Sequence, residues 1–93
     1  MTMVGRPTIA NVTMTDANTE YSYAVPSGAK RFEIKLRAIN ALLKLAFVSG
    51  ASGTTYITIP YGASYNELDI KGGMTLYFQS ATAAQTAEIK IWR

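Results

Sequence analysis

The chain has 93 residues, a net charge of +3 and 48% apolar residues, which is enough apolar material for the core of one domain. Cysteine and histidine are both absent. This composition excludes disulfides, Cys/His zinc sites and nucleophilic machinery built on a thiolate or a histidine base. Charged residues make up 16% of the chain, against about 25% in an average domain, so we expect other subunits to cover part of the surface.

No composition break or linker divides the chain, which predicts a single domain over residues 1–93 with residues 1–7 as an extended N-terminal arm. The apolar stretches are too short for a membrane span, and the first residues lack the apolar stretch of a secretory signal. We expect no cofactor and no metal ion. With six acidic residues and no histidine or cysteine, we identify no catalytic residues and expect no enzyme.

Turn-forming residues recur at short intervals, and the segments between them are rich in β-branched and aromatic residues. That spacing is typical of an all-β sandwich or barrel. Eight antiparallel strands of about six residues suit an antiparallel, jelly-roll-like β-sandwich. The expected strands are residues 8–14, 18–25, 30–38, 39–48, 54–60, 64–70, 74–79 and 87–92.

Alternation of apolar and polar residues predicts which side chains face the core. Phe47 is expected inside, whereas Glu67 and Asp69 are expected on the solvent side of their strand, opposite Leu68 and Ile70. The other expected core residues are Phe32, Ile34, Leu36, Leu76, Phe78, Ile89 and Ile91.

Residues 39–47 fit either a strand or a short helix. The β-rich surroundings favour a strand, joined to residues 30–38 in a hairpin with Asn40 and Ala41 at the turn.

Basic residues are densest on the outward face of residues 30–38, where Arg31, Lys35 and Arg37 lie on one side. A basic sheet face near tyrosines is a possible nucleic-acid-binding surface. Glu33 interrupts the run, and charged outward residues also protect a sheet from edge pairing. These residues are therefore expected to be a solvated face or to contact a protein, and no specific nucleic-acid partner is expected.

Five aromatic residues are expected on or near faces opposite the apolar residues: Tyr56, Tyr61, Tyr65, Tyr77 and Trp92. Exposed aromatic residues are favoured at protein interfaces, and they also stack on sugar rings. We favour an interface, because no cluster of acidic or amide residues accompanies them. A terminal segment, 8–13 or 88–93, is expected to be an edge strand that pairs with another chain.

Three stretches form a characteristic series: residues 25–37, residues 56–65 with the turn Ile59-Pro60-Tyr61-Gly62, and residues 74–92, which contain Leu76-Tyr77-Phe78-Gln79-Ser80. The region from residue 21 to residue 93 that contains them resembles small virion structural proteins encoded in tailed-bacteriophage genomes. The resemblance implies a β-sandwich that coats a particle, and it leaves a place in the head, neck or tail open.

Together these features predict a capsid decoration or cement protein, made in the bacterial host cytoplasm and located in the virion. Its expected partners are the major capsid protein or other virion subunits, and it is expected to form a homo-oligomer, for example a trimer. The alternatives are a carbohydrate- or receptor-binding sandwich, such as a tail-associated adhesin, and a small basic nucleic-acid-binding barrel.

Overall fold

The computed structural model describes residues 7–68, 70 and 73–92, and this part of the chain contains eight strands and no helix. The all-β class predicted from the sequence is confirmed, and residues 43–46 form a strand rather than a helix. The first six residues of the expected N-terminal arm lie outside the described part. The strands are β1 (Thr8–Met14), β2 (Tyr21–Ala24), β3 (Arg31–Leu36), β4 (Leu43–Ala46), β5 (Ile57–Ile59), β6 (Ser64–Leu68), β7 (Thr75–Gln79) and β8 (Gln85–Trp92).

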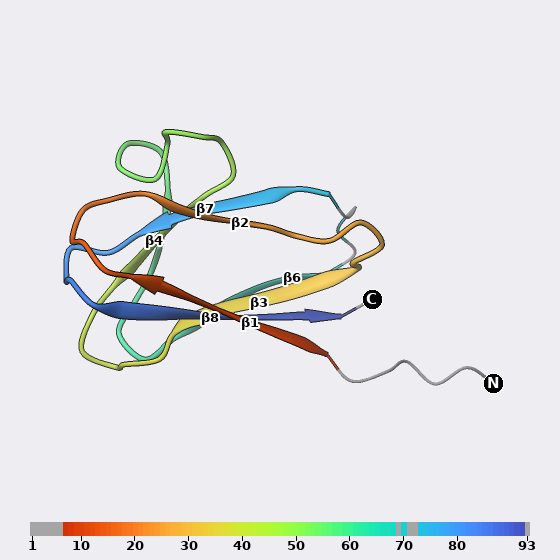
Figure 1. Ribbon diagram of the computed structural model, residues 1–93, viewed down its shortest axis with the longest axis horizontal. Helices are drawn as coiled ribbons and strands as arrows, with labels where there is room; N and C mark the ends of the chain where they lie inside the picture. Colours follow the sequence, from red (N-terminus) through yellow and green to blue (C-terminus); the bar gives the residue numbers. More distant parts are fainter. Residues whose placement is uncertain (1–6, 69, 71–72, 93) are drawn as a thin grey trace.

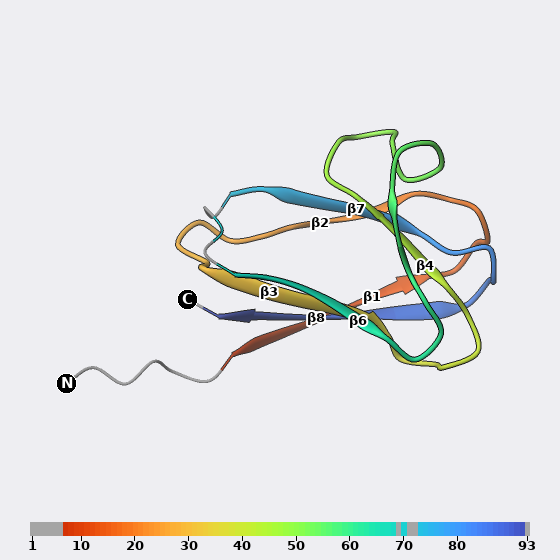
Figure 2. The ribbon, with the colours of Figure 1, turned by 180° about the vertical axis from the view of Figure 1, so that it is seen from behind.

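The strands form two four-stranded antiparallel sheets that face each other as two layers (Figures 1 and 2). Sheet A has the order β1-β8-β3-β6, and sheet B has the order β2-β7-β4-β5. The pairs β1·β8, β2·β7, β3·β6 and β4·β5 are nested like the two arms of one long hairpin with its tip at β4–β5. Winding of this double strand also brings β3 beside β8 and β4 beside β7. The result is a jelly-roll sandwich.

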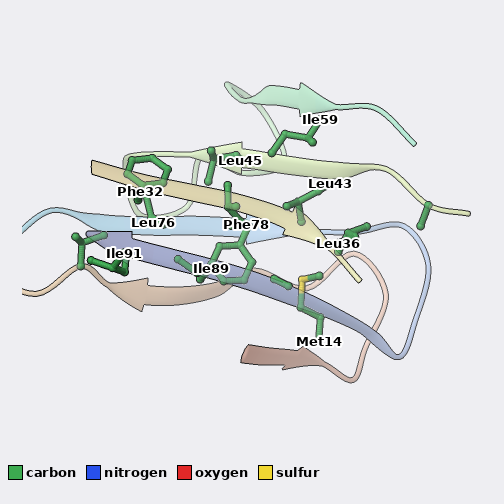
Figure 3. Packing of buried hydrophobic residues seen from close by; sticks show 14 of the residues in the cluster. Met14, Phe32, Leu36, Leu43, Leu45, Ile59, Leu76, Phe78, Ile89 and Ile91 are labelled. Carbon is green, nitrogen blue, oxygen red and sulfur yellow. The ribbon is translucent and has the colours of Figure 1, made fainter. Parts of the chain in front are cut away.

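The core lies between the two sheets, where apolar side chains from both layers meet (Figure 3). Strand β8 alternates strictly between buried and half-buried residues, as a strand in the middle of a half-buried sheet should. All seven residues of the strand alternation that were expected in the core are buried. Met14, Leu43, Leu45 and Ile59 complete the centre of the core.

The connection between β3 and β4 differs from the expected hairpin. β3 lies in sheet A and β4 lies in sheet B, so the chain crosses from one layer to the other between them. Ala41, expected at an exposed turn, is buried with only 3% of its surface exposed. Phe47 was expected in the core but is 40% exposed, because β4 ends at Ala46 and the alternation ends with it.

Strand β6 faces the opposite way from the sequence prediction. Tyr65 lies opposite Ile34 and Glu67 lies opposite Phe32, two residues that point into the core. Because directly opposed residues share a face, Tyr65 and Glu67 lie on the core side at the sheet edge. The predictions that Tyr65 points outward and that Glu67 faces solvent are wrong, and Asp69 lies outside the described residues.

Candidate interaction surfaces

The outer face of sheet A carries most of the predicted basic residues. We call it the charged face. The residues between the buried positions of β3 and β8 all point to this side. The structure thereby brings Arg31, Lys35 and Trp92 together on one surface, with Arg37 just beyond the end of β3. The members of the charged face are Arg31, Glu33, Lys35, Arg37, Glu88, Lys90 and Trp92.

Opposite charges meet across the strands of the charged face. Lys35 lies opposite Glu88, and Glu33 lies opposite Lys90. The Lys35 Nζ is 3.1 Å from Oε1 of Glu88, and the Arg37 Nε donates a hydrogen bond of 2.8 Å to Oε2 of the same carboxylate. The hydrogen bonds from Arg37 and then Lys35 lower the pKa of Glu88 below its ordinary value. Lys35 and Arg37 therefore already share a carboxylate, which weighs against a surface that tracks a phosphate backbone.

A shallow depression of about 260 Å³ lies on the charged face beside β1. Its volume is below the roughly 300–1,000 Å³ of typical small-molecule sites. Its charged side chains are paired with one another, so it presents little unpaired polarity to a ligand. The residues that line it are Ile9, Glu33, Lys35, Glu88, Ile89 and Lys90.

Trp92 lies at one end of the charged face between two cations. The Arg31 guanidinium carbon is 4.1 Å from the centroid of the indole ring, and the Lys90 Nζ is 5.0 Å from it. Both distances are within the range of cation–π attraction. The half-buried indole is therefore held against the sheet, and it is less available to stack on a partner than the sequence suggested.

Tyr65 stabilises the edge of sheet A. Its ring centroid is 6.2 Å from that of Phe32 in a tilted arrangement, and its hydroxyl donates a hydrogen bond of 2.6 Å to Glu67. That hydrogen bond, burial and the neighbouring negative charge raise the pKa of Tyr65 to about 12. The Tyr65 hydroxyl thereby gives the Glu67 carboxylate a hydrogen-bond partner on the core side of the strand.

Tyr77 lies on the outer face of sheet B. It stands opposite Ser22 on β2 and Ala46 on β4, and it is half-buried. The sequence prediction of an outward side chain is correct for Tyr77. The structure does not bring it next to Trp92, since the two residues lie on the outer faces of different sheets.

The long connection between β4 and β5 is fastened to sheet B by Glu20. The amides of Gly50 and Ser52 donate hydrogen bonds of 2.8 and 3.1 Å to this carboxylate, and the Ser52 hydroxyl donates a third of 2.6 Å. Ser52 is fully buried and also contacts Gln79 on β7. We call this cluster the loop latch. The connection projects beyond sheet B in Figures 1 and 2.

Exposed apolar side chains follow the β4–β5 hairpin and the connections at both of its ends. Of the eight large apolar residues that are exposed in the described part of the chain, seven lie between residues 39 and 61. Tyr61, predicted from the sequence as a partner-binding residue, is 64% exposed and belongs to this group. Ile39, at 76% exposure, lies within van der Waals reach of the position that a Cβ on Gly62 would take, so the β3–β4 and β5–β6 connections adjoin. We call the group the tip surface; it consists of Ile39, Leu42, Phe47, Val48, Tyr56, Ile57 and Tyr61.

Sequence reasoning missed most of the tip surface, since it assigned Phe47 to the core and passed over Ile39 and Val48. A signal was present. Phe47 and Val48 stand directly before Ser49 and Gly50, which begin a Ser/Gly-rich stretch typical of a loop, so the strand could have been ended before Phe47.

Within residues 7–68, 70 and 73–92, no three acidic side chains gather in an arrangement that could hold a metal ion. The same part of the chain has no helix long and apolar enough to cross a membrane.

No protein-family model matches the chain, and no curated protein matches it significantly. Among solved structures, the chain is similar to a de novo designed double-stranded β-helix determined by NMR in solution. The two share 17% sequence identity with a TM-score of 0.55, and the match covers 96% of this chain and all of the designed one. At this identity the similarity shows the fold alone, and it agrees with the nested double strand described above.

Proposed function

We propose that the protein is a non-enzymatic virion structural protein of a tailed phage, which decorates the capsid and stabilises the assembled shell. Two features support the proposal: the sequence resemblance of residues 21–93 and the tip surface. The fold adds only an analogy, since jelly rolls occur in capsid domains but also in lectins and enzymes.

The tip surface is the observation that carries the proposal. Exposed apolar side chains scattered over a surface need no explanation, but a concentration of them marks a contact site. Here they are confined to one hairpin and its two flanking connections. Tyr61 and Tyr56 also belong to a residue type that is enriched at the centres of protein interfaces. We therefore assign the tip surface as the side that contacts the major capsid protein.

The mechanism we propose is preferential binding to the assembled shell. A protein that binds neighbouring capsid subunits, and binds them only when they are assembled, lowers the free energy of the assembled state by mass action. A rigid sandwich suits this task, because little conformational entropy is lost when it binds.

The test is co-sedimentation of the purified chain with empty shells of its own phage. Replacing Ile39 and Tyr61 together by serine should weaken binding by at least tenfold, about 1.4 kcal/mol. Ala24→Ser is the control, because Ala24 is exposed on β2, at the opposite edge of sheet B from β5 and outside the tip surface. Its binding should stay within about twofold of the parent chain.

The same preparation separates the alternatives. Saturable binding to a glycan but not to shells would replace the proposal with a carbohydrate-binding function, and binding to single-stranded DNA that weakens steeply with salt would replace it with a nucleic-acid-binding one. If the variant with serine at both Ile39 and Tyr61 still binds shells as the parent chain does, the contact lies elsewhere and the assignment of the tip surface is overturned.

A further inference from the structure

The four edge strands of the sandwich differ in how well they are protected against pairing with another chain. An exposed edge offers free backbone donors and acceptors, and natural proteins protect it with short strands, bulges, prolines or charges that point inward. In sheet B, the edges β2 and β5 have only four and three residues. In sheet A, the edge β6 carries Glu67 on its core side.

Strand β1, the other edge of sheet A, has none of these protections. It is seven residues long, and its sequence Thr-Ile-Ala-Asn-Val-Thr-Met has no charge and no proline. Its register with β8 runs without a bulge from Thr8 to Met14. Among the described residues, only β8 pairs with it. The sequence prediction that an edge lies at the terminal segment 8–13 is therefore correct, whereas β8 is paired on both sides.

We propose that β1 pairs with β1 of a second copy of this chain, antiparallel and about a two-fold axis at Asn11, so that two copies of sheet A form one eight-stranded sheet. This inference does not rest on the proposed function, since it concerns the chain alone.

In this register, the side chains of β1 are compatible with those of β1 in the second copy. A two-fold axis at Asn11 sets Ala10 opposite Val12 of the second copy, on the core side where both residues already pack against the core. On the outer side, Ile9 would meet Thr13, and Asn11 would meet its own counterpart. Because β1 carries no charge, no like charges are opposed. The same pairing would cover the open backbone of the longest edge strand.

Asn11 and Asn66 provide a matched test of whether β1 or β6 is the edge strand that pairs with a second copy. Each is an exposed asparagine at the middle of an edge strand of sheet A. The chain contains no cysteine, so Asn11→Cys and Asn66→Cys each introduce a single thiol. Directly opposed residues have Cα atoms about 4.5–5.5 Å apart, within the disulfide range of about 4.4–6.8 Å. Under mild oxidation, we expect Asn11→Cys to form a covalent dimer rapidly and Asn66→Cys to form little.

Thr13→Cys tests the register. In the proposed pairing, the two copies of residue 13 are four residues out of alignment, roughly 13 Å apart along the strands, so this variant should cross-link far more slowly than Asn11→Cys. If Asn66→Cys cross-links as fast as Asn11→Cys, the choice of β1 is overturned. Equal rates at residues 11 and 13 would overturn the register.

The equilibrium itself is measured by analytical ultracentrifugation of the unmodified chain. Asn11→Lys sets two like charges opposite each other and should weaken the dimer several-fold, up to about fivefold, whereas Asn66→Lys should leave it unchanged. A parent chain that stays monomeric at about 1 mM, or a dimer that Asn11→Lys leaves unaffected, would overturn the proposal. Shell binding plays no part in either measurement, so failure here is distinct from failure of the proposed function.

Discussion

Phe78 and Phe47 show that a phenylalanine is buried within a strand but exposed just beyond a strand end. Phe78 lies within β7 opposite Leu45 and is fully buried, whereas Phe47 follows the last residue of β4 and is 40% exposed. Replacing Phe78 by alanine removes a ring from the centre of the core and should cost about 3–5 kcal/mol of unfolding free energy. Phe47→Ala should cost less than about 1 kcal/mol. Urea unfolding measures both, and equal losses would contradict the placement of the two rings.

Tyr65 should make stability depend on pH in the alkaline range. Its folded pKa of about 12 lies above the ordinary value of 10.0, so the fold favours the neutral hydroxyl that donates to Glu67. This contribution is complete below pH 10 and declines as the pH rises towards 12. We expect urea unfolding of the parent chain to show this decline. Tyr65→Phe has no ionisable hydroxyl and should show a smaller one, so parallel pH profiles would contradict the assignment.

At the scale of elements, the loop latch connects the β4–β5 connection to sheet B through one carboxylate. The Ser52 hydroxyl, followed by the Gly50 amide, lowers the pKa of Glu20 below its ordinary value of 4.5. The latch is therefore complete above this value and weakens as the pH falls through the lowered pKa. Glu20→Ala should speed hydrogen exchange of the Gly50 and Ser52 amides at neutral pH, roughly tenfold or more.

Glu33→Ala is the control for the latch. Glu33 also accepts a hydrogen bond from a serine, Ser64, but it lies on the other sheet. Exchange at Gly50 and Ser52 should be the same in this variant as in the parent chain. An increase in both variants would indicate general loosening rather than release of the connection.

The sequence predicts well which side chains face the core in strands that are paired on both sides. In β3 and β8 the alternation is complete, and every expected core residue of these strands is buried. It fails at β6, where Tyr65 and Glu67 form a hydrogen-bonded pair on the core side. An edge strand has a partly open core side, so a charged residue there costs little when it has a partner. Strand alternation alone carries no information about such a partner.

The failure at residues 39–48 has a different cause. The alternation in Leu43 and Leu45 correctly indicates a strand, but nothing in the local sequence says which sheet the strand joins. The nested pairing depends on contacts between residues far apart in the chain. The candidate interface residues share this limit: Arg31, Lys35 and Trp92 were predicted to point outward and do so, but their partners on neighbouring strands could not be read from the sequence.

For the whole molecule, the nested arrangement should set the folding rate. The outermost pair, β1·β8, joins opposite ends of the chain, and folding slows as paired residues become more distant in sequence. A circular permutant that joins residue 92 to residue 7 and opens the exposed turn between Ser27 and Gly28 makes β1 and β8 neighbours. It also brings β2 closer to β7 and moves no other pair of strands further apart in sequence. We expect it to refold faster in stopped-flow experiments.

A second permutant, with the same joint but opened at Gly50, is the control. It shortens the separation of β1 from β8 but makes β4 and β5 the most distant pair, so the gain is offset. Its refolding rate should stay close to that of the parent chain. If both permutants refold at the parent rate, strand separation does not limit folding.

The start of β1 and the end of β8 lie side by side, since Thr8 pairs with Ile91, and Figure 1 shows them at the opposite end of the sandwich from the β3–β4 and β5–β6 connections. An enzyme or epitope fused at either position would project away from Ile39 and Tyr61. Under the proposed function, cargo attached at the end formed by β1 and β8 should leave the contact made by Ile39 and Tyr61 undisturbed.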